Sequence, residues 1–290
     1  MVVASATDEG GRTGNEDALL VMPLSAVGEG ESASEAGFLA IVADGMGGYQ
    51  RGEVASQMAI DVIREMFEAD PGADPATLLK QAFRRANEKI YEGGMGASPS
   101  AMMGTTLIVA ATRGKYATIA NIGDSRAYLA RANRLTQVTK DHSFVAEQVA
   151  VGAMTEREAR ESPHRNILTH ALGHRPKLDS KIPNIFELTL LPEDRLLLCT
   201  DGFHDVVPEN DLLNVLLTSE PEPATQKLIQ IAKERGTTDN VTAVVFEALP
   251  AREPVVLAQR DARGVPPLIG LAAAAILILV ILAIVLLVVI

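Results

Sequence analysis

Short runs of aliphatic and β-branched residues recur along the chain and predict β-strands. Such residues favour strands because their side chains pack well on a pleated surface. Several runs are apolar at almost every position, so they need cover on both faces, from a second sheet or from helices. The predicted strands cover residues 38–42, 105–109, 118–120, 196–199 and 241–246.

Helical periodicity follows the first predicted strand. In residues 55–67 the apolar positions recur with the i, i+3, i+4 spacing of one buried stripe. The next stretch opens with Asp74 as a predicted N-cap and Pro75 at the first helical position, and its apolar stripe runs over residues 78–90. We expect an antiparallel helix pair, ended by a glycine-rich break at residues 92–96.

Two later stretches, residues 212–217 and 224–235, are also amphipathic and predict further helices. Gly236 is expected to end the second of them. With the strands, these helices fall within residues 1–249, which is long enough for one large domain with a full hydrophobic core.

The last 23 residues, 268–290, are 22 apolar residues and one glycine. As a helix they would span roughly 35 Å, against a hydrocarbon core of about 30 Å. A buried core helix would show some polar face, so we predict a transmembrane helix, joined to the body by a proline-containing linker at residues 250–267. A tail anchor and a span within a longer protein both stay open.

Composition and charge limit the partners and the cellular compartment expected for residues 1–249. The net charge is −11, which argues against nucleic acid as a partner, since phosphate backbones attract basic surfaces. The single cysteine, Cys199, excludes an intramolecular disulfide and a cysteine-rich metal site. The N-terminus lacks the basic and apolar regions of a signal peptide, and arginines precede the apolar tail. We therefore expect a single-pass membrane protein with its body in the cytoplasm.

Acidic residues stand beside glycines at the ends of several predicted strands. One Asp-Gly pair is usually a turn, but several at strand ends suggest a common purpose. If they converge, their like charges would repel unless cations are bound or some carboxylates are protonated. All-oxygen ligands suit Mg²⁺ or Mn²⁺ rather than zinc, and this indicates two-metal hydrolysis. Asp44, Asp124 and Asp201 adjoin glycines near strand ends, Asp239 immediately precedes a strand, and Glu16 and Asp17 lie near the N-terminus.

The motifs that contain these residues resemble, in order, those of the metal-dependent protein phosphatase family, type 2C, in its bacterial form. Each motif is weak alone, whereas the ordered set is specific and covers residues 7–246. The motifs are RTGNED (12–17), ADGMGG (43–48) followed by GEVAS (52–56), GTT (104–106), GDSR (123–126), TKDHS (139–143), CTDG (199–202) and DNVT (239–242).

The resemblance implies both a fold and a reaction. The fold would be α+β, a four-layer α-β-β-α sandwich of two antiparallel sheets flanked by helix pairs, with the C-terminal transmembrane helix added. The reaction would be hydrolysis of phosphoserine and phosphothreonine monoesters by a water that bridges two metals. No side-chain nucleophile is then needed, so no phosphoenzyme is expected.

The resemblance also implies two core ions, Mn²⁺ or Mg²⁺, in each active site. Asp44 would bridge both, and the carbonyl of Gly45 would bind one of them. The other core ligands would be Asp201 and Asp239 for the first ion and, directly or through water, Glu16 and Asp17 for the second.

Two further roles follow from the resemblance. Asp124, together with Asp201, would hold a weaker third ion. Arg12 would grip the substrate phosphate, because a guanidinium matches phosphate oxygens in bidentate geometry. Arg12 and Asp44 are therefore the predicted catalytic residues.

One departure leaves the source of the leaving-group proton open. Animal members carry a histidine where this chain has Met46, and a thioether cannot donate a proton. The acid would be a metal-bound water or a group on the mobile flap, predicted at residues 151–166 with a helix at 155–160. His164 is the flap candidate, although a flap histidine is more often an exposed surface residue.

The remaining polar residues near these motifs have simpler interpretations. Cys199 is expected to pack in the core and His142 to make structural hydrogen bonds. Arg126 is expected to support the Asp124 loop rather than to touch substrate. His204 and Asp205 are interpreted as polar residues of a loop and helix cap, without a part in the site.

The resemblance implies phosphorylated proteins as partners, including a serine/threonine kinase and its substrates, with the membrane bound through the tail. Three alternatives stay open. One is a catalytically silent module of the same fold that binds a phosphoprotein or kinase, and another is a phosphatase dedicated to one anti-sigma-factor antagonist. A nuclease or other two-metal phosphoesterase would be expected to have a basic groove, which the charge does not suggest.

Overall fold

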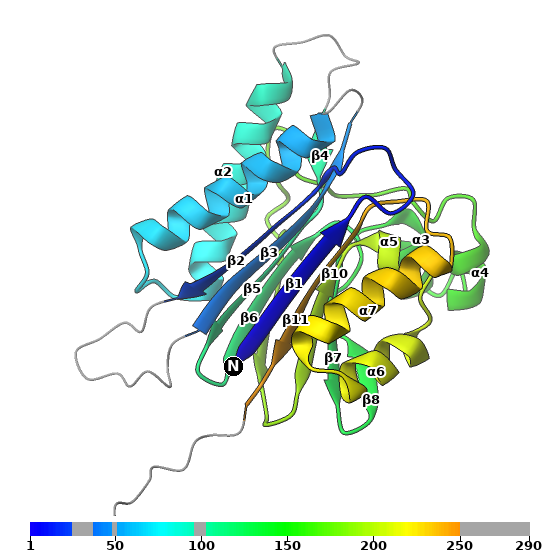
Figure 1. Ribbon diagram of the computed structural model, residues 1–290. Helices are drawn as coiled ribbons and strands as arrows, with labels where there is room; N and C mark the ends of the chain where they lie inside the picture. The colour runs from blue at the N-terminus through cyan, green and yellow to red at the C-terminus, as the bar shows by residue number, and fades with distance from the viewer. Residues whose placement is uncertain (25–36, 48–50, 96–102, 250–290) are drawn as a thin grey trace, which may run out of the picture. The chain divides into compact units, whose positions relative to one another are not determined.

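The computed structural model describes residues 1–24, 37–47, 51–95 and 103–249 (Figure 1). The predicted linker and transmembrane helix lie outside the described residues, as does Gly48 of the ADGMGG motif. Across the part of the chain that is described, no helix combines the length and apolarity needed to span a membrane.

Two antiparallel sheets form the centre of the body. In the first, the strand order is β1-β11-β10-β7-β8, and in the second it is β2-β3-β5-β6-β9, with β4 paired to β3. The first sheet contains β1 (Val2–Asp8), β11 (Val241–Glu247), β10 (Arg195–Cys199), β7 (Arg126–Arg131) and β8 (Arg134–Gln137). The second contains β2 (Asp17–Leu24), β3 (Gly37–Met46), β4 (Gly104–Thr105), β5 (Leu107–Arg113), β6 (Tyr116–Ile122) and β9 (Asn184–Thr189).

Helices cover the outer face of each sheet (Figure 1). The helices α1 (Arg51–Ala69) and α2 (Pro75–Met95) pack on the second sheet. The first sheet is covered by α5 (Asp201–His204), α6 (Glu209–Thr218) and α7 (Pro221–Glu234). Two short helices, α3 (Phe144–Ala150) and α4 (Glu156–Glu161), follow β8.

Alternation along the strands explains why the runs are apolar throughout. In β3, Leu39 and Ile41 belong to the cluster shared with α1 and α2, whereas Ala40 and Val42 belong to the cluster between the sheets. Each strand face therefore meets a different apolar layer, as expected for strands covered on both sides. The predicted α+β arrangement of two antiparallel sheets with helices outside is confirmed.

The predicted elements occur in the expected places. All five predicted strands are present, although 105–109 is divided between β4 and β5. The four helices predicted from periodicity in the body are present, and α2 begins as expected, with the Thr77 amide donating to Asp74 Oδ2 at 2.8 Å. Gly236 follows α7 with a φ of +76°, the left-handed conformation that favours glycine at a helix end.

Two predicted boundaries are wrong. β3 runs on to Met46, so Asp44 lies inside a strand and not after one. The glycine-rich break does not begin at residue 92, because α2 continues to Met95. A Cβ at Gly93 would lie 2.7 Å from Met103 Cε, so this glycine serves close packing inside the helix and does not end it.

The strands that sequence periodicity missed are β1, β2, β7, β8 and β9. Four of them, β1, β2, β8 and β9, are the edges of the two sheets. Their residues are largely half-buried or exposed. In β1, β8 and β9 polar and apolar types mix, so the apolar pattern is weak. β2 is apolar after Asp17, and the Pro23 within it is typical of an edge strand.

Candidate functional site

The antiparallel pairing brings the predicted acidic residues to one end of the two sheets. Asp17 begins β2 and lies opposite Asp44 of β3. Asp201 lies two residues after the end of β10, which pairs with the first part of β7 and of β11. Asp124 and Asp239 lie two residues before the starts of β7 and β11. The strand ends therefore gather carboxylates that are far apart in sequence.

The clustered aspartates make ionisation costly. Burial, followed by the charges of neighbouring aspartates, raises the pKa of Asp17 and of Asp124 to about 7. Burial is also the main cause for Asp44, whose pKa lies well above its ordinary value, with Asp201 the next cause. The pKa of Asp201 is raised for the same reason, with Asp239 among the neighbours that raise it. Such a cluster is expected to bind cations or protons.

The donor set fits a divalent cation. Asp17 Oδ2 accepts hydrogen bonds from Thr242 Oγ1 at 2.7 Å and Thr200 Oγ1 at 3.0 Å. Its other oxygen, Oδ1, is buried without a hydrogen-bond partner, and so is Oδ1 of Asp201. Buried oxygens without partners are unusual, and a hard cation would satisfy them.

The carboxylates do not already form a coordination shell. Among the residues that the structure describes, no three histidine, cysteine, aspartate or glutamate side chains form a ready set of ligands for one ion. Bound ions would have to draw these side chains together, and backbone carbonyls and water would complete the shell.

Arg12 lies at the mouth of this cluster, already paired with one of its carboxylates. Its Nη2 atom is 2.7 Å from Asp239 Oδ2, and its Nε atom donates to the Thr238 carbonyl at 3.1 Å. Both side chains are partly exposed. Beside them opens a cavity of about 350 Å³, which Glu16 and Glu53 also line. The guanidinium therefore stands where an anion entering this cavity would meet it.

The GEVAS motif shapes the backbone around Glu16. The Gly45 amide donates to the Glu16 carbonyl at 3.2 Å, and Ser56 Oγ donates to the same oxygen at 2.7 Å. A Cβ at Gly45 would lie 2.1 Å from the Gly52 carbonyl oxygen. The glycines are therefore required by the close approach of β3 and the start of α1.

The GTT motif fixes the backbone of Asp44. The Thr106 amide and Thr105 Oγ1 both donate to the Asp44 carbonyl, at 2.9 Å and 2.8 Å. The Asp44 amide donates to Thr106 Oγ1 at 3.1 Å, and that hydroxyl lies 2.8 Å from Ser125 Oγ. The GTT and GDSR motifs thus join directly behind Asp44.

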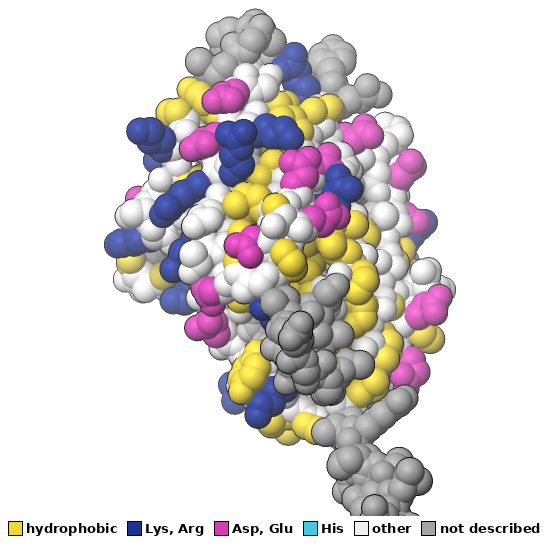
Figure 2. Space-filling model, turned by 90° about the vertical axis from the view of Figure 1, so that its left-hand side faces the viewer, with side chains coloured by type: hydrophobic (Ala, Val, Ile, Leu, Met, Phe, Trp, Pro, Cys, Tyr) yellow, Lys and Arg dark blue, Asp and Glu magenta, His cyan; other side chains and the backbone are white. Residues whose placement is uncertain are grey.

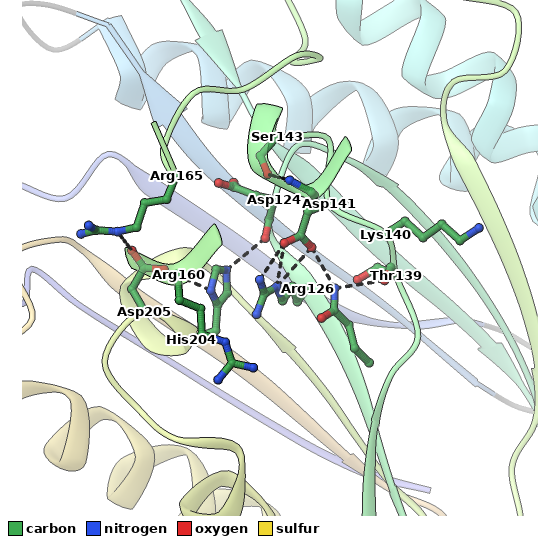
Figure 3. A network of polar contacts seen from close by, with 12 residues as sticks. Asp124, Arg126, Thr139, Lys140, Asp141, Ser143, Arg160, Arg165, His204 and Asp205 are labelled. Carbon is green, nitrogen blue, oxygen red and sulfur yellow. Dashed lines mark hydrogen bonds and ion pairs between the residues drawn. The ribbon is translucent and has the colours of Figure 1, made fainter. Parts of the chain in front are cut away.

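His142 and Arg126 have structural roles, as predicted, but Arg126 acts through a different neighbour. His142 Nδ1 accepts from the Gly123 amide at 3.1 Å, so the histidine holds the Asp124 loop. Arg126 Nε and Nη2 instead donate to Asp141, at 3.0 Å and 2.7 Å (Figure 3). Cys199 is fully buried in β10, and burial raises the pKa of its thiol to about 12, which confirms core packing.

His204 and Asp205 lie closer to the carboxylates than their interpretation as loop polarity suggested. His204 Nε2 lies 3.1 Å from the Asp124 carbonyl oxygen, and its Nδ1 lies 3.4 Å from Asp205 Oδ1 (Figure 3). Asp205 Oδ2 lies 3.6 Å from Arg165 Nε. The positions of His204 and Asp205 in the sequence are a signal for this placement, because both lie within four residues of Asp201, on α5 and at its C-cap.

The predicted flap helix is present as α4. Thr155 caps it in a capping box with Glu158, which is a sequence-local arrangement. His164 is exposed, and its ring packs edge-on against Phe144 with 6.1 Å between ring centroids. The structure thus brings His164 to the surface of the flap, and a catalytic role for it stays a prediction.

A larger cavity, of about 750 Å³, lies between the flap segment and the carboxylates. Asp124, Asp201 and His204 line it on one side, and Ala146 and Arg160 contribute from α3 and α4. Fold and site together define a class: an α+β sandwich whose strand ends gather carboxylate oxygens of the kind that suit divalent cations, beside a guanidinium.

Comparison with known proteins identifies the family. The protein phosphatase 2C family matches residues 26–244 of this chain. The serine/threonine protein phosphatase PstP of Mycobacterium tuberculosis is 37% identical over 212 residues, 73% of this chain and 40% of PstP. The serine/threonine phosphatase stp of Listeria welshimeri is 34% identical over 214 residues, 72% of this chain and 84% of that protein. The chain belongs to the protein phosphatase 2C family.

A solved structure extends the likeness to three dimensions. The catalytic domain of PstP in complex with two manganese ions has a TM-score of 0.71 and 34% sequence identity, and the match covers 86% of this chain and 98% of that one. The chain thus spans nearly all of that catalytic domain, but less than half of the full-length PstP that it matches.

Proposed function

We propose that this protein is a metal-dependent protein phosphatase that hydrolyses phosphoserine and phosphothreonine monoesters. Family membership supports the reaction class. The observation that carries the proposal is the pair of buried carboxylate oxygens without partners, Asp17 Oδ1 and Asp201 Oδ1, within a cluster of aspartates with raised pKa values. These features suit a site that is completed by cations.

We propose Asp44, the Gly45 carbonyl, Asp201 and Asp239 as ligands of the core ions, with Glu16 and Asp17 serving the second ion directly or through water. Asp124 and Asp201 would hold a weaker third ion. Mn²⁺ and Mg²⁺ both suit such oxygen ligands. When bound, the ions lower the pKa of the attacking water and offset charge that develops on the phosphoryl oxygens.

Arg12 is proposed to bind the substrate phosphate. Its guanidinium is held by Asp239 at 2.7 Å, and a phosphate would compete with that carboxylate for the same donors. Ion binding by Asp239 would weaken its hold on Arg12, because the carboxylate oxygens would then face a cation. Ion binding and phosphate capture are thus linked through one carboxylate.

The proposal is tested with the full chain in detergent solution, using p-nitrophenyl phosphate and a phosphothreonine peptide in Mn²⁺. Asp44→Asn and Asp239→Asn should each lower kcat by about a thousandfold or more, since the ions supply most of the catalysis. Asp211→Asn, a change at the exposed Asp211–Arg235 pair, serves as the matched control.

Retained turnover in either site variant would contradict the ligand assignment. EDTA-insensitive binding of a phosphoprotein without Mn²⁺-dependent turnover by the unsubstituted chain would instead identify a catalytically silent module.

We further propose that residues 268–290 anchor the protein in a membrane with its body in the cytoplasm, near membrane-bound kinases and their substrates. The uncharged apolar run supports this proposal. Leu279→Arg/Leu282→Arg should move the protein from the membrane fraction to the soluble fraction, because charge in a bilayer core is costly. Gln259→Arg in the linker is the control, and unchanged fractionation of the double variant would contradict the anchor.

A further inference from the structure

Three exposed lysines lie around one side of the larger cavity: Lys80 on α2, Lys140 after β8 and Lys181 before β9. We call them the lysine surface. Within the described part of the chain, none of the three makes a close ion pair, although Lys80 acts at longer range on Asp74 and Lys181 on Asp179. They are surplus positive charges on a protein whose net charge is −11.

The arginines that line the same cavity differ from the lysines. Arg126 pairs with Asp141, Arg160 with Glu156 and Arg165 with Asp205. Their charges are therefore offset by carboxylates within the protein, whereas those of the lysine surface are available to a ligand. Figure 3 shows Lys140 extending away from the Arg126–Asp141 pair.

The lysine surface is continuous with the proposed active site. Lys140 and Lys181 line the 750 Å³ cavity that Asp124 and Asp201 also line. A neighbouring cavity of about 420 Å³ shares Lys140 and Lys181 and adds Lys80. A chain segment that leaves the carboxylates through the first cavity would therefore reach all three ammonium groups.

The backbone beneath two of these lysines is held in place. The Lys140 carbonyl accepts from Asn121 Nδ2 at 2.9 Å, and the Lys181 amide donates to Asp179 Oδ1 at 2.9 Å. The pKa of the Asp179 carboxyl is lowered by this backbone hydrogen bond and also by the nearby charge of Lys181. Lys80 is exposed on α2. On the face that Figure 2 shows, Lys and Arg side chains gather mainly on the left.

The charge distribution indicates which ligand fits. A carboxylate-rich site repels acidic substrates, and an unpaired basic surface beside it would offset that repulsion and orient them. We infer that the lysine surface binds anionic side chains, carboxylates or a second phosphate, that flank the phosphorylated residue of a protein substrate. This inference rests on the proposed phosphatase function and adds to it a preference for acidic substrate segments.

The test compares two peptides that carry the same phosphothreonine, one flanked by glutamates and the other by glutamines. The full chain should hydrolyse the acidic peptide with a KM about fivefold lower and a similar kcat, because a few exposed charge pairs contribute little each. The double variant Lys80→Glu/Lys181→Glu should lose this preference, with its kcat for p-nitrophenyl phosphate unchanged.

A matched control separates a local effect from a change in net charge. Arg134→Glu/Lys227→Glu alters the charge by the same amount at exposed positions outside these cavities, and it should keep the preference. Raising the salt concentration should reduce the preference of the unsubstituted chain, because exposed charges are screened.

Fluorescence anisotropy of the labelled acidic peptide measures binding without turnover, so a failure of the phosphatase proposal is distinguishable from a failure of this one. Equal KM and equal binding of the two peptides by the unsubstituted chain would overturn the inference. A preference for the acidic peptide that survives in Lys80→Glu/Lys181→Glu would also overturn it. So would a double variant that loses binding to phosphatidylserine vesicles but still binds the acidic peptide as the unsubstituted chain does.

Discussion

His142 holds the loop that carries Asp124 through a ring nitrogen that has to stay unprotonated. Its Nδ1 atom accepts from the Gly123 amide, and its Nε2 atom lies 2.9 Å from the Asn184 side-chain amide. Burial, with His170 as the next cause, lowers the pKa of His142 from 6.5 to about 4. If Nδ1 were protonated, it could no longer accept the hydrogen bond from the Gly123 amide.

This shift predicts a loss of stability in acid. Because the folded-state pKa of His142 is depressed, its contribution is fully present above about pH 6.5 and is lost as the pH falls through about 4. The shift corresponds to about 3 kcal/mol of unfolding free energy. The difference in urea unfolding free energy between the full chain and a His142→Asn variant across this pH range measures it, because the raised pKa values of Asp17 and Asp124 act in the opposite direction in both chains.

A His142→Asn variant should show a shallower loss of unfolding free energy over the same pH range. His174→Asn, at an exposed histidine, is the matched control and should keep the original slope. The same slope in His142→Asn as in the unsubstituted chain would contradict the assignment.

Among elements, the contact of β3 with the start of α1 leaves no room for a side chain at Gly45. A Cβ there would lie 2.1 Å from the Gly52 carbonyl oxygen and 2.6 Å from that of Glu16. Gly45→Ala should therefore lower the unfolding free energy by about 1–3 kcal/mol and reduce phosphatase activity, because the backbone beside Asp44 has to shift.

Gly14→Ala is the control for this prediction. No atom lies within 4 Å of a Cβ at Gly14, so its unfolding free energy should change by no more than about 0.5 kcal/mol. Denaturant unfolding checks both variants. Equal stability of Gly45→Ala and the unsubstituted protein would show that β3 and α1 separate easily.

Local periodicity was enough to predict the longer helices α1, α2, α6 and α7, but not the short helices α3 and α5. It was less informative for strands. The apolar residues of α2 all lie on one face of the helix, and its cap, Asp74, bonds to the nearby Thr77 amide and not to a distant residue. The edge strands β1 and β8 have no comparable pattern, because only one side of an edge strand is paired and its faces are partly exposed to solvent. The end of β3 was misplaced because Asp44 is polar, although the strand continues through it.

For the whole molecule, the repulsion among clustered carboxylates predicts that ions stabilise the fold. At pH 8, Mn²⁺ at about a hundred times its Kd should raise the Tm of the full chain by about 5–10 °C. In EDTA, Asp44→Asn should melt higher than the unsubstituted chain, because it removes one like charge from a cluster that raises the pKa of each member.

Differential scanning calorimetry distinguishes the two effects. Asp44→Asn should lose most of the Mn²⁺-dependent rise in Tm, whereas Asp211→Asn should keep it. A Mn²⁺ response of equal size in Asp44→Asn would show that the stabilising ion binds elsewhere.

The sequence by itself determined the family, the longer helices, most of the buried strands and the identity of the acidic residues, because these depend on local spacing and on ordered motifs. Only the tertiary structure decided how those residues meet. Antiparallel pairing placed Asp17 opposite Asp44, and packing turned Asp239 towards Arg12 and His204 towards the Asp124 loop. Such contacts join positions that are far apart in the chain, so no local pattern predicts them.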